Sequence, residues 1–197
     1  IKTVLKESYR VPSSIHPYAL SLINRNKNRE PKIWKPRKEK GLIKFPNYKD
    51  LSLFKEGQWL LLAATGYHLD KICSDMKHQG LYFKRKNFSS VSQEAIDAMF
   101  VWDRLIKGEA LSLQDVKLIY KYISSKTGLK WGAKKLEGVT EDQTLTFRDL
   151  KGHHGLLISE NTPWTVALDR MSEKEKRMIQ SLSKKNEDLT KPPRITV

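Results

Sequence analysis

An unbroken apolar run, Trp59–Thr65, constrains the fold of this chain more than any other feature. It is bounded by Gly57 and Gly66, and this predicts a strand that is buried on both faces, as in a parallel sheet. A helix is expected over Tyr67–Gln79, because its apolar residues recur at helical spacing: Leu69, Ile72, Cys73 and Met76. Gly80 suits the position after a helix end, and a strand-like run follows it. This order predicts a βαβ unit and therefore an α/β fold.

The start of the chain predicts a short strand followed by a helix. Thr3–Leu5 is β-prone, and Ser13 or Ser14 can cap the helix. Tyr9 and Arg10 follow the predicted strand, at the edge where α/β folds bind ligands. A tyrosine can stack on a base, and an arginine can contact a phosphate through a fixed fork of donors. A half-buried tyrosine beside a solvated arginine is the alternative.

Helices are predicted across residues 87–188, and the strand signal returns only at the end of the chain. Helix caps are expected at Ser90 or Ser92, Ser112, Thr162–Pro163, and Ser172 with Glu175. Residues 127–154 favour a loop. Arg194–Val197 is strand-like again, so we expect it to join the parallel sheet that holds Leu60–Ala63. The predicted domains are residues 1–86 with 189–197 as one discontinuous α/β domain, and 87–188 as a helical insert.

The composition points to a polyanionic partner. The net charge is +15 and the pI is about 9.8. The single cysteine, Cys73, excludes an internal disulfide and fits a reducing cytoplasm, and it is expected in the core of its helix. No segment is long and apolar enough to span a membrane, and no signal-peptide pattern starts the chain, so we expect a cytoplasmic protein without a membrane partner.

Three basic segments are candidate phosphate contacts, each with a solvated loop as its alternative. The first is the charge run Asn24–Lys40, which Trp34 is expected to anchor. The second is Lys84, Arg85 and Lys86 at the predicted domain junction. The third surrounds Trp131, which either stacks on a base or anchors the loop to the core; its cations are Lys126, Lys130, Lys134 and Lys135. His153–His154 is the only pair that hints at metal, and a structural or solvent-facing pair is favoured, so no metal site is predicted.

In their order along the chain, these segments resemble the second RecA-like domain (2A) of superfamily 1 DNA helicases of the UvrD/PcrA/Rep type, with its inserted 2B-type subdomain. Ser8–Val11 resembles motif IV, Ala63–Gly66 the ARTN-type segment, and Gly80–Phe83 the GG-x-x-FF-type segment. A strand like Ile195–Val197 precedes motif V in that family. This chain departs from the family at Ala64, where an arginine is usual, and at Gly66, where asparagine is frequent.

The resemblance implies an incomplete RecA-like parallel sheet with a mainly helical insert. It also implies part of an ATP-dependent helicase that moves along single-stranded DNA, 3′ to 5′, and unwinds duplex. Tyr9 would then stack on the adenine, and Arg10 would bind the nucleotide and act as a catalytic arginine finger. Contacts to DNA would come from four residues: Thr65, Lys84, Arg85 and Lys86.

The same resemblance implies partners outside this chain. The whole enzyme would use ATP and Mg²⁺, would bind single- and double-stranded DNA, and would carry a first RecA-like domain. A bacterial or phage-infected cell is the expected setting. The sequence has no G-x-x-x-x-G-K-[ST] loop and no acidic Walker B strand. We therefore expect a piece of a longer protein that binds no ATP by itself and is inactive alone. A stand-alone basic nucleic-acid-binding module without catalysis is the alternative.

Overall fold

The computed structural model describes residues 7–28, 32–45, 56–86 and 88–197. It divides into two compact units, Ile1–Leu51 and Ser52–Val197. Helices and small parallel or mixed sheets make up the chain, so the predicted mixed α/β class is confirmed. The finer division into a RecA-like domain with an insert at 87–188 stays a prediction.

The first unit contains a parallel strand pair and one helix. Strand β1 (Glu7–Pro12) pairs with β2 (Lys35–Arg37), and helix α1 (His16–Ile23) connects toward β2. Thr3–Leu5 lies outside the described residues. The predicted charge-run loop thus contains a strand, which pairs with β1. Pro36 has no N–H to donate, which suits an exposed strand.

The expected serine caps of α1 were wrong, because both serines bond elsewhere. The Ser13 hydroxyl donates to the Glu39 carbonyl at 3.2 Å. The Ser14 hydroxyl donates to the Gly41 carbonyl at 2.6 Å and accepts from the Gly41 N–H at 2.8 Å. They tie the start of α1 to residues 39–41. Trp34 packs edge-on against His16 with ring centroids 4.2 Å apart, as expected of an anchor for the charge run.

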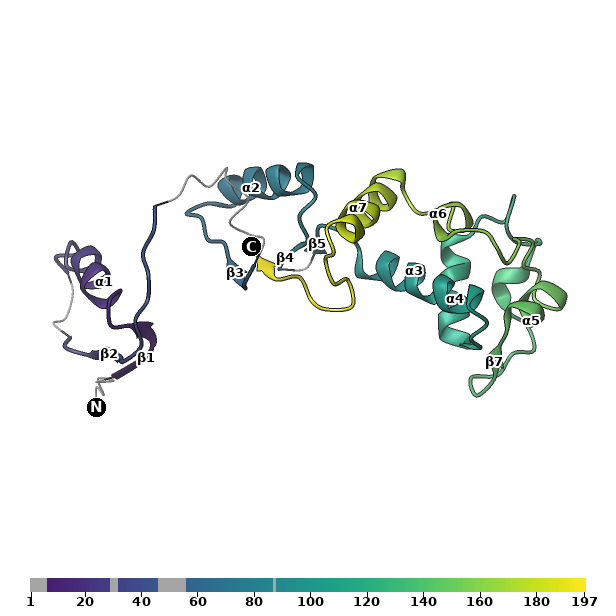
Figure 1. Ribbon diagram of the computed structural model, residues 1–197, viewed down its shortest axis with the longest axis horizontal. Helices are drawn as coiled ribbons and strands as arrows, with labels where there is room; N and C mark the ends of the chain where they lie inside the picture. Colours follow the sequence, from purple (N-terminus) through teal and green to yellow (C-terminus); the bar gives the residue numbers. More distant parts are fainter. Residues whose placement is uncertain (1–6, 29–31, 46–55, 87) are drawn as a thin grey trace. The chain divides into compact units, whose positions relative to one another are not determined.

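A four-stranded sheet opens the second unit, and its order is β3-β8-β4-β5. The strands are β3 (Trp59–Leu60), β4 (Phe83–Arg85), β5 (Phe88–Ser89) and β8 (Ile195–Thr196). Strand β8 runs parallel to both neighbours, with Ile195 opposite Trp59 and Phe83. Figure 1 shows this terminal strand, in yellow, beside β3 and β4. Ile195 joins the sheet holding Leu60, as predicted, but the single parallel sheet expected for the β-rich first part was wrong. Strand β5 runs antiparallel to β4, and β1 and β2 pair in a sheet of their own.

The predicted burial of the apolar run on both faces was wrong. Strand β3 has only two residues, and Leu60 and Leu62 are 65% and 80% exposed. An apolar strand is buried on both faces only where layers cover both sides of its sheet. In the described ranges β3 pairs on one side alone, with β8, so it is an edge strand.

Helix α2 (Gly66–His78) lies within one residue of its prediction. Thr65 caps it, with its hydroxyl accepting from the His68 N–H. Cys73 is buried in the helix, as expected. Gly80 adopts a φ of 63°, the left-handed conformation that ends a helix most readily with glycine.

The remainder of the second unit is a helical block around one large apolar core. Its elements are α3 (Gln93–Ile106), β6 (Leu111–Ser112), α4 (Leu113–Tyr122), the short 3-10 helix η2 (Ala133–Lys135), β7 (Thr144–Leu145), α5 (Phe147–Gly152), α6 (Trp164–Ala167) and α7 (Glu173–Lys184). Ser112 accepts from the Asp115 N–H, and Ser172 forms a complete capping box with Glu175. These two predicted caps are confirmed. Ser92 occupies the N-cap of α3, with no side-chain bond there.

The loop expected over residues 127–154 was wrong in part, because it contains β7 and α5. Thr146 and Asp149 form a capping box at the start of α5. Their spacing equals that of Ser172 and Glu175, so the sequence carried the signal. Glycine- and lysine-rich neighbours hid it. Each helix in the described part of the chain is too short or too polar to cross a membrane.

Candidate nucleic-acid interface

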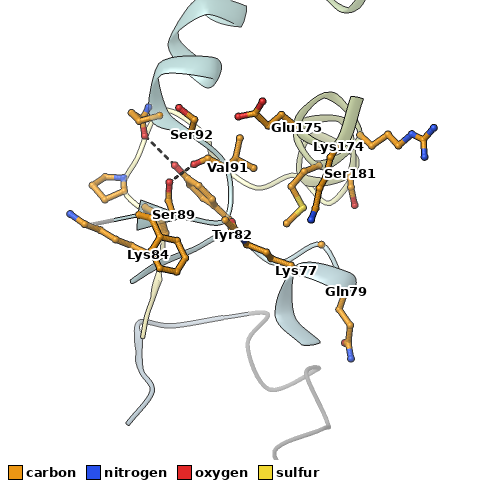
Figure 2. Close-up of a pocket in the computed structure, with 18 of the residues that line it drawn as sticks. Lys77, Gln79, Tyr82, Lys84, Ser89, Val91, Ser92, Lys174, Glu175 and Ser181 are labelled. Atoms are coloured by element: carbon orange, nitrogen blue, oxygen red, sulfur yellow. Dashed lines mark hydrogen bonds between the residues drawn. The ribbon is translucent and has the colours of Figure 1, made fainter. Parts of the chain in front are cut away.

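A groove of about 1230 Å³ lies between the β4–β5 hairpin, the end of α2, the first turns of α7 and residues 190–193. Figure 2 shows Tyr82 between its two sides, with Lys84 and Ser89 on one and Lys174 and Ser181 on the other. Four chain segments therefore supply its walls. Two of them are separated by more than 80 residues in the sequence, so only the fold brings them together.

Cations dominate the lining of this groove. Six positively charged side chains contribute: Lys77, Lys84, Lys86, Lys174, Arg177 and Lys191. Among the described lining residues Glu175 alone carries a carboxylate, and that group already accepts from the Ser172 N–H and hydroxyl. None of the ion pairs between described residues uses Lys84, Lys86, Lys174 or Arg177. Four exposed cations thus face a shared hollow that suits a phosphate backbone.

The structure separates Arg85 from its two lysine neighbours. Lys84 and Arg85 are successive residues of β4 and point to opposite faces of the sheet, so Lys84 lines the groove while Arg85 points toward α2. Lys86, in the turn after β4, also lines the groove. The Arg85 guanidinium forms an ion pair with Asp70. This bond, the largest cause, raises the pKa of Arg85. Arg85 therefore holds β4 against α2, and only two of the three predicted phosphate contacts lie together.

Two aromatic rings lie between the cations of the groove. Tyr82 is buried, and its hydroxyl donates to Gln93 Oε1 at 3.2 Å. Burial, helped by the negative charges of Asp97 and Glu187, raises the pKa of this phenol, so it stays a donor. Phe88 is half exposed, with Lys77 Nζ 5.5 Å from its ring centroid. Phe88 therefore gives the groove one exposed aromatic ring, whereas Tyr82 is buried.

Contacts between α7 and α2 fix the width of the groove. Lys185 Nζ donates to the Gln79 carbonyl and, at 3.1 Å, to the Gly80 carbonyl. A cation at these carbonyls also offsets the negative end of the α2 dipole. A Cβ on Gly80 would come within 2.7 Å of the Ser181 hydroxyl oxygen, so the two helices approach closely at this point. The two walls are thereby held together at one end.

Lys191 differs from the other cations of the groove because it has an acidic partner. Its Nζ lies 2.9 Å from Asp188 Oδ2. Bonds from Lys191 first, then from Thr190, lower the pKa of Asp188 to about 2. A depressed carboxyl pKa stabilises the fold above the ordinary value near 3.9 and loses that effect as the pH falls through about 2. The pair is therefore intact at neutral pH, and Asp188 neutralises the positive charge that Lys191 would otherwise contribute to the groove.

Replacing Asp188 by Asn should release this charge to the groove. Asn keeps an oxygen for the Thr190 N–H but loses its attraction for Lys191. We expect tighter binding of single-stranded DNA and a salt slope steeper by up to about 0.7, the contribution of one additional phosphate contact. Fluorescence anisotropy over a salt series measures both. Asp142→Asn is the control, because it makes the same change of net charge outside the groove, and its salt slope should equal that of the parent. Equal slopes for the two variants would contradict the placement of Lys191 in the DNA-binding groove.

Thr65 lies away from this groove, at the N-terminus of α2. Its hydroxyl lies 2.7 Å from His68 Nδ1 and also accepts from the His68 N–H. These contacts give Thr65 a capping role in the structure. Its contact with DNA stays a prediction.

Tyr9 and Arg10 lie within β1 rather than at its end, in the first unit. Both are exposed, Tyr9 by 82%, and the Tyr9 hydroxyl donates to Glu7 Oε2 at 3.3 Å. The strand register shifts between Glu7 and Pro12, and Ser8 Oγ accepts from the N–H groups of Arg10 and Val11. Such an irregularity redirects side chains that strict alternation would send to opposite faces. Both side chains are accessible to a ligand.

A metal site receives no support from the described residues. No group of three or more His, Cys, Asp or Glu side chains converges within them. His154 instead uses its backbone carbonyl, which accepts from the buried Tyr120 hydroxyl at 3.0 Å. The side chain of His153 is exposed and that of His154 is half-buried.

The sequence alone missed four of the groove's cations: Lys77, Lys174, Arg177 and Lys191. Lys174 and Arg177 are three positions apart on α7, so they share one helix face, and this spacing was a readable signal. Lys77 and Lys191 offered none, because only the parallel insertion of β8 brings residues 190–193 to the hairpin.

Compared with known protein families, with curated proteins and with solved structures, the chain gives no match. The groove is therefore interpreted from its own charge and geometry. Exposed cations beside an aromatic ring are features that nucleic-acid-binding surfaces share.

Proposed function

We propose that this chain is part of an ATP-dependent DNA helicase of the UvrD/PcrA/Rep type, and that its basic groove binds DNA. The segment order supports a 2A-type domain, interrupted by a 2B-type helical block. The observation that carries the proposal is the position of β8. This strand lies between β3 and β4, parallel to both, although the whole helical block separates it from β4 along the chain.

In this proposal the longer protein hydrolyses ATP between two RecA-like domains and moves 3′ to 5′ along single-stranded DNA. Its phosphate loop and its Mg²⁺-binding acid belong to the first of these domains, since the present sequence has neither motif. Tyr9 and Arg10 act at the nucleotide. Lys84 and Lys86 act with the other groove cations on the DNA backbone.

Removing four groove cations should weaken DNA binding strongly. We expect the salt slope to flatten by up to about 3, because each phosphate contact on a single strand contributes about 0.7. The groove variant carries Lys84→Gln, Lys86→Gln, Lys174→Gln and Arg177→Gln. The matched control removes the same charges outside the groove, with Lys107→Gln, Lys117→Gln, Lys151→Gln and Arg148→Gln.

Anisotropy titrations of a labelled single strand over a salt series decide between the two variants. The control should keep most of the slope, since it changes only the overall charge. If both variants lose affinity equally, binding depends on net charge alone and the groove is not the site. Far-UV circular dichroism checks that both variants are folded.

A second function, a basic nucleic-acid-binding module without catalysis, is favoured by the groove itself. DNA binding by this chain would satisfy both proposals. ATP hydrolysis stimulated by single-stranded DNA, assayed on the longer protein, separates them. A longer reading frame without a phosphate loop before Ile1 would exclude the helicase proposal.

A further inference from the structure

Trp131 is an exposed aromatic side chain on a firmly held stem. Its indole is 97% exposed, whereas Leu129 and Leu156 beneath it are each 1% exposed. These two leucines form a β-bridge. The Lys130 N–H donates to the Gly155 carbonyl at 2.8 Å, and the Leu157 N–H donates to the Gly128 carbonyl at 2.9 Å. The backbone before Trp131 is thus fixed, and the indole extends beyond it.

This geometry excludes a role for Trp131 as the hydrophobic anchor of its loop. The anchors are Leu129 and Leu156, together with Leu136 after the turn. Gly155 packs closely under the loop, since a Cβ there would lie 2.9 Å from Ala133 Cβ. A tryptophan that contributes no burial is free to offer its ring face to a ligand.

The chain turns back directly after Trp131 and brings cations around it. The Ala133 N–H donates to the Lys130 carbonyl, and the Lys135 N–H donates to the Gly132 carbonyl, which closes η2. Lys130, Lys134 and Lys135 therefore belong to the same tight turn of the chain as Trp131. Cations beside an exposed aromatic ring are typical of sites that bind single-stranded nucleic acid.

Arg170 adds a cation from a distant segment. Its N–H donates to the Tyr122 carbonyl at 2.9 Å, which fixes its backbone. Burial chiefly, and then repulsion by Arg170, lower the pKa of Lys134. Nearby Asp169 is engaged by the Ser124 N–H at 2.7 Å and the Thr127 hydroxyl at 2.8 Å. In the described part of the chain, no ion pair joins Lys134 or Arg170 to a carboxylate.

We propose that the Trp131 loop is a second binding point for single-stranded nucleic acid, with an unpaired base stacked on the indole and the flanking phosphates on Lys130, Lys134 and Arg170. An unpaired base is required, because in a duplex both faces of each internal base are already stacked. This site goes beyond the proposed function, since it needs neither ATP nor the groove.

Trp131→Ala should weaken binding of a labelled oligothymidylate about tenfold, while Trp131→Phe should retain most of the affinity. Stacking releases no counterions, so the salt slope should stay unchanged in Trp131→Ala. Lys134→Gln should flatten that slope. Leu157→Ala is the matched control, because it removes a half-exposed apolar side chain from the neighbouring segment. It should bind as the parent does.

Anisotropy titrations with oligothymidylate, oligouridylate and a blunt duplex provide the test. The two single strands differ in the 2′-hydroxyl and in the C5 methyl of the base, and stacking on Trp131 predicts a loss of affinity for both in Trp131→Ala. Parent-like affinity of Trp131→Ala for both single strands would overturn the proposal, as would an equal loss on the duplex. If the four-residue groove variant has a flatter salt slope but Trp131→Ala binds as the parent does, the groove proposal is kept and only the Trp131 site is rejected.

Discussion

Replacing Trp102 by Ala should lower the free energy of unfolding of Ser52–Val197 by about 3–5 kcal/mol. Trp102 is fully buried on α3, and its ring centroid lies 6.3 Å from that of Phe147 on α5. Its Nε1–H donates to the Thr162 carbonyl at 2.9 Å, just before α6. The change therefore creates a cavity between three segments and leaves a carbonyl without its donor.

Urea unfolding followed by far-UV circular dichroism measures this loss. Trp131→Ala is the matched control, since it removes the same side chain from an exposed position and should change the stability by less than about 0.5 kcal/mol. Similar losses for the two variants would mean that α3 is not the centre of this core. An unchanged m-value, the slope of the unfolding free energy against urea concentration, shows that both variants expose the same surface area on unfolding.

Local chemistry made most helices of the second unit predictable. Ser112 and Ser172 cap their helices through bonds within three residues, so the sequence alone contains both partners. The range of α2 followed from the helical spacing of its apolar residues and from Gly80 at its end, whereas the cap by Thr65 was seen only in the structure. Thr146 shows the limit, because an identical signal was hidden by its neighbours.

Burial and site assembly depend on contacts that are distant along the chain. The run at Trp59 was expected to be buried, yet it forms an edge strand whose apolar residues are exposed. The groove joins residues 77–93 to residues 174–193, and the sequence pattern of neither segment predicts that the two lie side by side. The sequence could locate Lys84 and Lys86, but only the fold shows that Arg85 has a separate partner.

In the longer enzyme that our proposal implies, Arg10→Ala should lower the kcat of ATP hydrolysis by about 10³-fold or more. A guanidinium directed at the transferring phosphoryl group gains its interaction mainly as charge develops there, so nucleotide binding should change much less. Arg10→Lys should not restore activity, because a point charge cannot reproduce the bidentate fork. The exposure of Arg10 and the irregular register of β1 are compatible with such a contact.

Tyr9→Ala should have the opposite kinetic signature. A ring stacked on adenine interacts equally in the ground state and in the transition state, so its loss raises KM and leaves kcat nearly unchanged. Steady-state ATPase assays on both alanine variants separate the two roles. Arg25→Ala is the control, since it removes an exposed arginine from the same unit, beyond the end of α1. A kcat for Arg10→Ala equal to that of Arg25→Ala would make Arg10 a solvated surface residue and remove the catalytic assignment, whereas a split between kcat and KM across Arg10 and Tyr9 is expected only if both side chains contact one bound nucleotide.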